Sequence, residues 1–515
     1  MSAAMDDASN AEGKASETRS EHRFEDERTA SQQPGSDKQG LKNIDEDPNV
    51  VDWNGPSDVE NPMNFSSAVK AINVSLISAL TFLTPLASSM LAPGVPLIQA
   101  EFNSHSNLLA DFVVSVYVLG FALGPLLIAP LSELYGRVVV YHVCNVGFVI
   151  FNVACAVSTD MGMLIVFRFF AGCFGSAPVT NGGGTIADLI APQKRGGVIA
   201  IYALGPILGP VIGPVIAGYL VAARGWRWVF WFLAIVSGGF TLISLAFLRE
   251  TYPPVLLERK TQRSRKAHNN PGLRSKLDKS LTPGQLFARS IIRPTKILFL
   301  SPIVLLLSIY MGIVYGYQYL MFSTFSAVFE QQYGFSTQSI GLSFLGIGIG
   351  SLIGLFAVGA ISDRIVKARA KPSKKNPEGK MQPEFRLPPL FAGAFFIPAG
   401  LFMYGWTAQY KEPWIAPEIG TALVGIGNMA VFMVVVTYLV DAFTIYAASA
   451  LAANTVVRSI MGALLPLAGQ KMYASLGVGW GNSLLGFIAV ACIPVPWALM
   501  KYGERLRTSF DSSRL

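Results

Sequence analysis

The ionisable residues within long apolar segments are the groups of this chain that could do chemistry. Arg168, Asp111 and Arg458 fall within such segments, where an unpartnered charge costs about 3 kcal/mol or more. We expect Arg168 to bias the titration of a nearby carboxyl group during proton exchange, with Asp111 as its candidate partner. The alternatives are an Arg168 that snorkels outward and an Asp111 that is an exposed loop charge. Arg458 lies about three turns into its segment, too deep to snorkel easily, so a buried partner or an anionic substrate group is expected there.

A second group of charged residues lies at the ends of the apolar segments. These residues could close one face of the molecule through ion pairs and helix dipoles, and a plain solvated charge is the alternative for each. No Asp, Glu or His lies at the centre of an apolar segment, so the sequence does not identify the group that would carry a proton. The candidate gating residues are Glu133, Arg137, Asp188, Asp363, Arg364 and Asp441.

Tyrosines and amides within the apolar segments are candidates for ligand recognition. Aromatic walls with few polar points suit large amphipathic ligands. Packing or anchoring of the tyrosines at the membrane surface is the alternative. The candidate substrate-binding residues are Asn73, Tyr202, Tyr310, Tyr317, Gln318, Asn428, Asn454 and Arg458.

The elements that must position these residues are membrane-spanning helices. Hydrophobic residues make up 51% of the 515 residues and charged residues 14%, with a mean hydropathy of +0.44, whereas soluble domains carry about 25% charged residues. A span needs about 20 mostly apolar residues, and the sequence predicts twelve spans. They cover residues 69–93, 109–131, 138–158, 163–189, 197–221, 228–248, 298–325, 339–362, 387–408, 416–440, 447–473 and 480–500.

Lysine and arginine are concentrated in alternate loops, and this asymmetry predicts the orientation. The segment after the sixth span and the loop after the eighth are strongly basic, so both are expected in the cytoplasm, together with both termini. The net charge of +8 then reflects topology and attraction to an anionic inner leaflet, not nucleic-acid binding. The predicted divisions are a disordered cytoplasmic tail (1–65), an N-terminal six-helix bundle (66–248), a basic cytoplasmic linker (249–296), a C-terminal six-helix bundle (297–501) and a cytoplasmic tail (502–515).

The fifth predicted span carries a glycine-proline step at every fourth residue. Each proline removes a backbone donor and the glycines form a smooth face, so we expect a kinked, closely packed helix that acts as a hinge. The string resembles the antiporter signature G-x-x-x-G-P-x-x-G-G of proton-driven drug exporters in the major facilitator superfamily. The hinge residues are Gly205, Pro206, Gly209, Pro210, Gly213 and Pro214.

Other segments resemble the same superfamily. Residues 130–137 resemble its loop between spans two and three, although Ala129, Glu133 and Leu134 depart from that pattern, and residues 168–178 resemble its fourth-span motif. An offset of 230 residues aligns span two with span eight, which indicates an internal repeat. The resemblance implies an all-α membrane protein with the major facilitator fold, in which twelve transmembrane helices form two six-helix halves. The segments 51–56, 61–65, 180–188 and 454–458 look like the fungal branch of the twelve-span drug:proton antiporters.

This resemblance implies a proton-coupled exporter of small hydrophobic or amphipathic compounds such as drugs, toxins or secondary metabolites. It would work by alternating access in the plasma membrane, as a monomer, with no cofactor, no metal and no enzymatic activity. The alternatives are an uptake carrier for sugars, polyamines or metabolites, and a non-transporting membrane receptor with a transporter fold. The glycine-proline span favours export over uptake.

Overall fold

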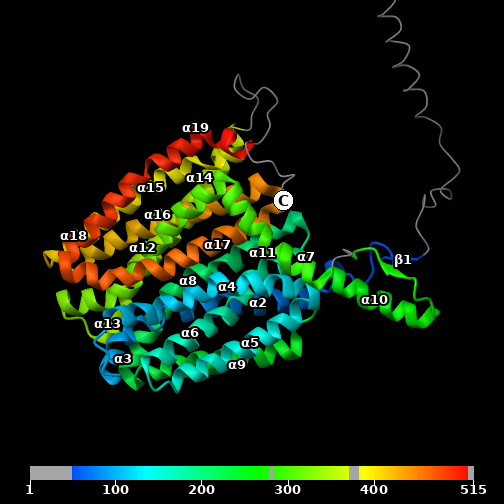
Figure 1. The fold of residues 1–515 in the computed structure, drawn as a ribbon, viewed down its shortest axis with the longest axis horizontal. Helices are drawn as coiled ribbons and strands as arrows, with labels where there is room; N and C mark the ends of the chain where they lie inside the picture. Colours follow the sequence, from blue (N-terminus) through cyan, green and yellow to red (C-terminus); the bar gives the residue numbers. More distant parts are fainter. Residues whose placement is uncertain (1–48, 279–281, 370–381, 509–515) are drawn as a thin grey trace, which may run out of the picture. The chain divides into compact units, whose positions relative to one another are not determined.

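Long apolar helices dominate the structure. The computed structural model describes residues 49–278, 282–369 and 382–508, and the residues from Val51 onward form one unit. Within this unit the helices of the first half and those of the second half lie on opposite sides (Figure 1). The first half consists of α2 (Ser67–Ser89), α3 (Val95–Glu101), α4 (Asn107–Tyr135), α5 (Arg137–Ala156), α6 (Met161–Gly175), α7 (Ala177–Leu189), α8 (Pro192–Arg224) and α9 (Arg227–Phe247).

The second half repeats this arrangement around an aromatic core. Phe322, Phe325 and Phe344 are fully buried there. It consists of α12 (Pro302–Tyr333), α13 (Thr337–Leu342), α14 (Leu345–Arg369), α15 (Pro388–Gln409), α16 (Ile415–Phe443), α17 (Ala447–Leu464), α18 (Gly469–Cys492) and α19 (Pro494–Thr508). Short 3-10 turns precede or connect the long helices: η1 (Pro62–Asn64), η2 (Ala92–Gly94), η3 (Pro383–Arg386), η4 (Thr444–Tyr446) and η5 (Leu465–Ala468).

The described residues contain 11 helical runs that are long and apolar enough to cross a membrane. The last run, Ala447–Thr508, is 62 residues long and folds back at Gly477, where the backbone is non-helical (φ 76°, ψ 168°). The Tyr473 hydroxyl donates to Asn482 Oδ1 at 3.0 Å, although nine residues of a straight helix rise about 13 Å. This run therefore has the shape of two passes, while the predicted count of twelve spans and the location of the termini stay predictions.

Helix α8, the predicted hinge, is continuous through its three prolines and packs closely on α2. A Cβ atom at Gly205, Gly209 or Gly213 would lie 3.0, 2.8 or 2.7 Å from backbone atoms of α2. Pro214 cannot donate to the carbonyl of Pro210, and the Ser89 hydroxyl on α2 donates to that oxygen at 2.8 Å instead. The two helices are thus joined by backbone contact and by a replacement hydrogen bond.

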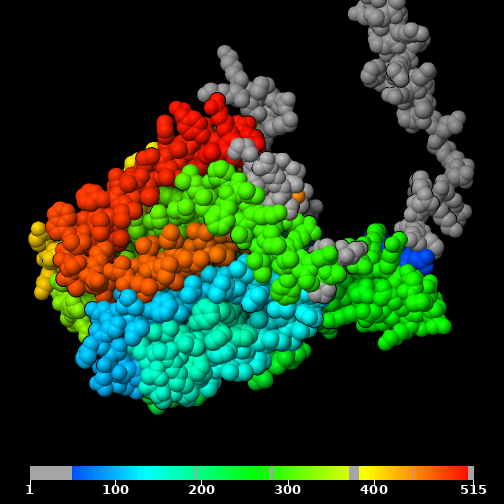
Figure 2. All heavy atoms as spheres, in the orientation of Figure 1, coloured from blue at the N-terminus to red at the C-terminus, as the bar shows by residue number. Residues whose placement is uncertain are grey.

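The two halves meet along two pairs of helices. In the first pair α17 lies along α4, which is visible in Figure 2 as the orange band above the light blue one. In the second pair α8 packs on α13 and the start of α14. Gly341 of α13 approaches Pro214 so closely that a Cβ would lie 2.4 Å from its carbonyl oxygen. The halves therefore touch on both flanks of the interface.

The basic segment between the halves is largely ordered, and it binds residues that precede α2. It contains α10 (Pro253–His268), β2 (Arg274–Ser275) and α11 (Pro283–Leu300), and β2 pairs with β1 (Val50–Val51). Asp58 pairs with Lys260 at 2.6 Å, and Asp52 pairs with Lys276 at 2.5 Å.

These contacts correct the predicted boundary of the N-terminal tail. Residues 51–65 adopt defined structure because basic side chains of the linker neutralise their carboxylates. The expected disorder of residues 1–48 falls outside the described part of the chain.

Candidate transport site between the two halves

The halves are bridged at the end of the bundle where α4 begins and α12 ends, which we predict to face outward and call the outer end. The Asp111 carboxylate of α4 accepts hydrogen bonds from the backbone N–H and the side-chain Nε2 of Gln470 on α18, at 3.4 and 3.2 Å. Ser326 of α12 donates to the carbonyl of Ala92 at 2.9 Å. Since both contacts join the two halves, the outer end is closed in this structure.

Arg168 lies in the middle of the first half and is 1% exposed. Its Nη2 donates to the carbonyls of Ser88 and Val114, at 3.1 and 3.4 Å, and its guanidinium lies over the Tyr117 ring at 5.3 Å. These contacts connect α6 to α2 and α4. Among the described residues Arg168 forms no ion pair with Asp111, so the expected partnership between these two is not formed.

A series of contacts leads from Arg168 across the interface to Arg458. Ser88, whose carbonyl accepts from Arg168, shares a hydrogen bond with the Tyr319 hydroxyl of the second half at 3.0 Å. The Tyr315 hydroxyl lies 3.5 Å from that of Tyr319, one helical turn away. The Arg458 guanidinium of α17 lies over the Tyr315 ring at 4.7 Å. The two arginines named from the sequence are therefore connected through two tyrosines.

Three of the predicted amides lie on the helices that surround Arg458. Asn428 of α16 donates to Gln318 of α12 at 2.6 Å. Asn454, one turn before Arg458 on α17, directs its Nδ2 to the sulfur of Met311 at 3.1 Å, and its Oδ1 is buried without a hydrogen-bond donor. The structure thus gathers these amides on α12, α16 and α17.

Four other predicted substrate residues make packing or hydrogen-bond contacts within one half in this structure, and their role in substrate binding stays a prediction. Tyr310 and Tyr317 face α15 and α18 around Ile397 and Cys492, on the other side of α12 from Tyr315. The Tyr202 hydroxyl donates to carbonyls of α7, and Asn73 accepts from the Arg249 backbone where the linker begins. Apolar composition could not reveal these orientations, because each depends on how the helices are rotated.

Three of the predicted gating residues, Arg137, Asp188 and Asp441, take part in two ion pairs, one in each half. Arg137, at the start of α5, pairs with Asp188, at the end of α7, at 2.9 Å. Arg386, just before α15, pairs with Asp441 near the end of α16. Each pair stays within its own half, so neither pair bridges the halves in this structure.

The remaining predicted gating residues are Glu133, Arg364 and Asp363. Glu133 is exposed and lines a groove of about 570 Å³ that also contains Tyr252 and Arg259. Arg364 is exposed on α14, and the side chain of Asp363 lies outside the described part of the structure.

Sequence reasoning missed three polar residues. Glu250 accepts hydrogen bonds from the backbone N–H groups of Arg137 and Val138 and so caps the start of α5. Glu418 is buried near the start of α16 and accepts from the Gly346 N–H at 3.0 Å. Arg386 had a signal in the sequence, because the repeat of Asp188 and Asp441 predicts a second arginine at the start of the ninth span. Glu250 and Glu418 had no such signal.

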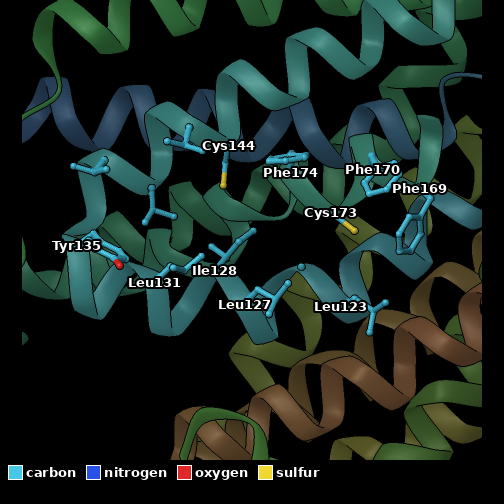
Figure 3. A pocket seen from close by; sticks show the side chains of 14 residues that line it. Leu123, Leu127, Ile128, Leu131, Tyr135, Cys144, Phe169, Phe170, Cys173 and Phe174 are labelled. Atoms are coloured by element: carbon cyan, nitrogen blue, oxygen red, sulfur yellow. The ribbon is translucent and has the colours of Figure 1, made fainter. Parts of the chain in front are cut away.

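A wholly apolar groove of about 470 Å³ lies on the first half, between α4, α5 and α6. Figure 3 shows Leu123 and Leu127 of α4 on one wall and Phe169 and Phe170 of α6 on the other. None of the predicted site residues lines this groove. It offers apolar contact without a group that could recognise polar chemistry.

The fold and the site define a helical membrane carrier, in which two homologous halves enclose buried polar groups. The sequence matches the Major Facilitator Superfamily over residues 77–466, and the chain belongs to this superfamily.

The relatives and solved structures agree with this assignment. The chain is 69% identical to MFS-type transporter tndD of Aspergillus flavipes (91% of this chain, 87% of the relative). It is 54% identical to efflux pump radE of Floropilus chiversii (91% and 86%). Among solved structures, a D-xylose-proton symporter has a TM-score of 0.63 at 17% identity (84% and 98%). A bacterial homologue of the human lysosomal transporter Spinster, in an inward-facing conformation, has a TM-score of 0.62 at 14% identity (86% and 99%).

Proposed function

We propose that this protein exports small hydrophobic or amphipathic compounds, such as drugs, toxins or secondary metabolites, by proton antiport with alternating access in the plasma membrane. The observation that carries the proposal is the buried contact of Ser88 with Tyr319 between Arg168 and Arg458, because it connects polar groups of both halves in an otherwise apolar interface. A carrier needs such a contact that can form in one state and break in another.

Two observations support export rather than uptake. One is the 54% identity to a protein named as an efflux pump. The other is the glycine-proline face of α8, which packs on α2 and resembles the antiporter signature. The bound partners in this proposal are the transported compound, protons and an anionic inner leaflet.

For coupling, we propose Asp111 as a proton-binding group and Arg168 as the residue that positions α2 and α4 around it. Asp111 is 1% exposed and meets Gln470 of the opposite half, so any opening of the outer end must change its surroundings. Arg168 fixes both neighbouring helices through their carbonyls. The ion pairs Arg137–Asp188 and Arg386–Asp441 are proposed to stiffen the inner ends of each half.

The test uses inside-out plasma-membrane vesicles from yeast lacking its own drug pumps. Uptake of three amphipathic probes is followed under an acid-inside proton gradient: rhodamine 6G, dansyl-phenylalanine and dansyl-phenylalaninamide. We expect uptake of at least one probe that a protonophore abolishes and that Arg168→Ala reduces. No uptake of any probe despite correct surface expression would overturn export, and uptake only into right-side-out vesicles would indicate an uptake carrier.

A further inference from the structure

We propose that Arg458 binds the anionic group of the transported compound, so that amphipathic organic acids are the preferred substrates. This inference rests on the proposed function and adds the chemical class of the substrate. It starts from the geometry of the guanidinium, which is held on two sides by aromatic rings on helices α12 and α16.

Two aromatic rings contact the guanidinium without taking the place of carboxylate or carbonyl acceptors. Its central carbon lies 4.7 Å from the centre of the Tyr315 ring and 5.4 Å from that of Phe432. A guanidinium has five N–H donors in its plane, and attraction to an aromatic ring does not by itself satisfy all of them. The Nε atom is buried and has no hydrogen-bond acceptor in the described structure. The side chain is therefore positioned, and its donors are not all used.

Arg458, which is half-buried, differs from Arg137, Arg168 and Arg386 in what accepts its hydrogen bonds. Arg137 and Arg386 have carboxylate partners, and Arg168 donates to two carbonyls. Among the described residues no carboxylate forms an ion pair with Arg458. A cation at membrane depth is costly without a counter-ion, and a carboxylate of the substrate would supply one through two parallel hydrogen bonds.

The surroundings fit a ligand that is acidic at one end and otherwise apolar. The Oδ1 atom of Asn454, one turn away, is buried without a donor; this oxygen accepts hydrogen bonds, so it would take an N–H or O–H donor of the ligand and not its carboxylate. Tyr315 is connected through the Tyr319 hydroxyl to Ser88 of the first half. An anion bound at Arg458 would therefore lie close to Tyr315, which is connected through Tyr319 to Ser88. Its binding can influence the contact between Tyr319 and Ser88 that joins the two halves.

The experiment compares two ligands that differ only in charge. Full-length protein in lipid nanodiscs is titrated with dansyl-phenylalanine, which carries a carboxylate, and with dansyl-phenylalaninamide, which is neutral. We expect the wild-type protein to bind the acid more tightly. In Arg458→Gln the affinity for the acid should fall about 10- to 100-fold, the scale of one lost charged hydrogen-bonded contact, while the affinity for the amide stays unchanged.

Two further variants separate ligand binding from structural damage. Arg458→Lys keeps the charge but not the planar fork, so it should retain a weaker preference for the acid. Arg224→Gln removes an arginine at the last residue of α8, in the first half, that lies over the Trp228 ring, and it should change neither affinity. Equal binding of acid and amide by the wild type, no binding of the acid, or an equal loss of both ligands in Arg458→Gln would each overturn the inference. Failure of the proposed function would appear separately, as absent uptake in the vesicle assay.

Discussion

Asp111 and Gln470 are 359 residues apart in the chain, and their side chains meet at the outer end of the interface between the two halves. The backbone N–H of Gln470 donates to Oδ2 of Asp111 and its side-chain Nε2 donates to Oδ1. Because Asp111 belongs to α4 and Gln470 to α18, this contact exists only while the halves are together at that end.

Replacing Gln470 with alanine should shift the protein toward an open outer end. A hydrogen bond to a charged group contributes about 1.5–3 kcal/mol, so the population of the open state should rise about 10-fold or more. Spin labels on His105→Cys and Ala474→Cys, both at exposed positions, would report a longer distance between the halves. The four native cysteines are buried or half-buried. An unchanged distance in Gln470→Ala would mean that other contacts alone keep this end closed.

Replacing Gly209 with alanine should destabilise the protein. The added methyl group would lie 2.8 Å from backbone atoms of Phe82 and Leu86, which cannot move as a side chain can, and overpacking of this kind costs about 1–3 kcal/mol. Gly238→Ala in α9 is the matched control, since no atom lies within 4 Å of its added methyl. Thermal unfolding in detergent should show a lower midpoint for Gly209→Ala only. Equal midpoints would contradict close packing of α8 on α2.

Replacing Ser89 with alanine should leave the Pro210 carbonyl without a donor. A buried acceptor that loses its partner costs about 1–3 kcal/mol. Pro214→Ala restores a backbone N–H for the same carbonyl, so the double variant should be more stable than Ser89→Ala alone. A double-mutant cycle on the free energy of unfolding measures this coupling. Additive effects would show that the hydroxyl does not replace the missing backbone donor.

The contact between Asp58 and Lys260 should be insensitive to pH over the neutral range. The hydrogen bond from Lys260 lowers the pKa of Asp58 from 3.8 to about 2. Because the pKa is lowered in the folded state, the contribution is complete above pH 3.8 and is lost as the pH falls through about 2. Spin labels on Ser57→Cys and Gln262→Cys should keep a constant distance from pH 8 to about pH 4 and separate below it.

The control for this titration is Asp58→Asn, which removes the charge at every pH. Its labels should be further apart at pH 7, with a smaller change on acidification. A distance in Asp58→Asn that matches the wild type at pH 7 would show that Asp52 and Glu60 are sufficient to hold residues 51–65 on the linker.

The sequence predicted the helical spans well because an apolar run of the right length has few alternatives in a membrane. It also identified Arg168 and Arg458 as charges that are costly within a membrane. The close approach of α8 to α2 at Gly209 could be predicted because glycine has no side chain. The sequence could not predict which face of α12 points at α17. Tyr310, Tyr315, Tyr317 and Tyr319 are all tyrosines of one apolar helix, and nothing in the sequence tells which of them face α17. Helix rotation depends on contacts between segments far apart in the chain, as with Gln470 and Asp111.

The fold-back at Gly477 has a consequence for how the chain enters the bilayer. Only this residue breaks the helical backbone between two long apolar runs, so no hydrophilic loop is available to hold the first run in place while the second is made. We therefore expect the two runs to insert together as a helical hairpin. Any residue with a side chain at position 477 would be strained at this positive φ angle. Such a substitution is expected to reduce insertion of the protein into the membrane, an effect that precedes any effect on transport.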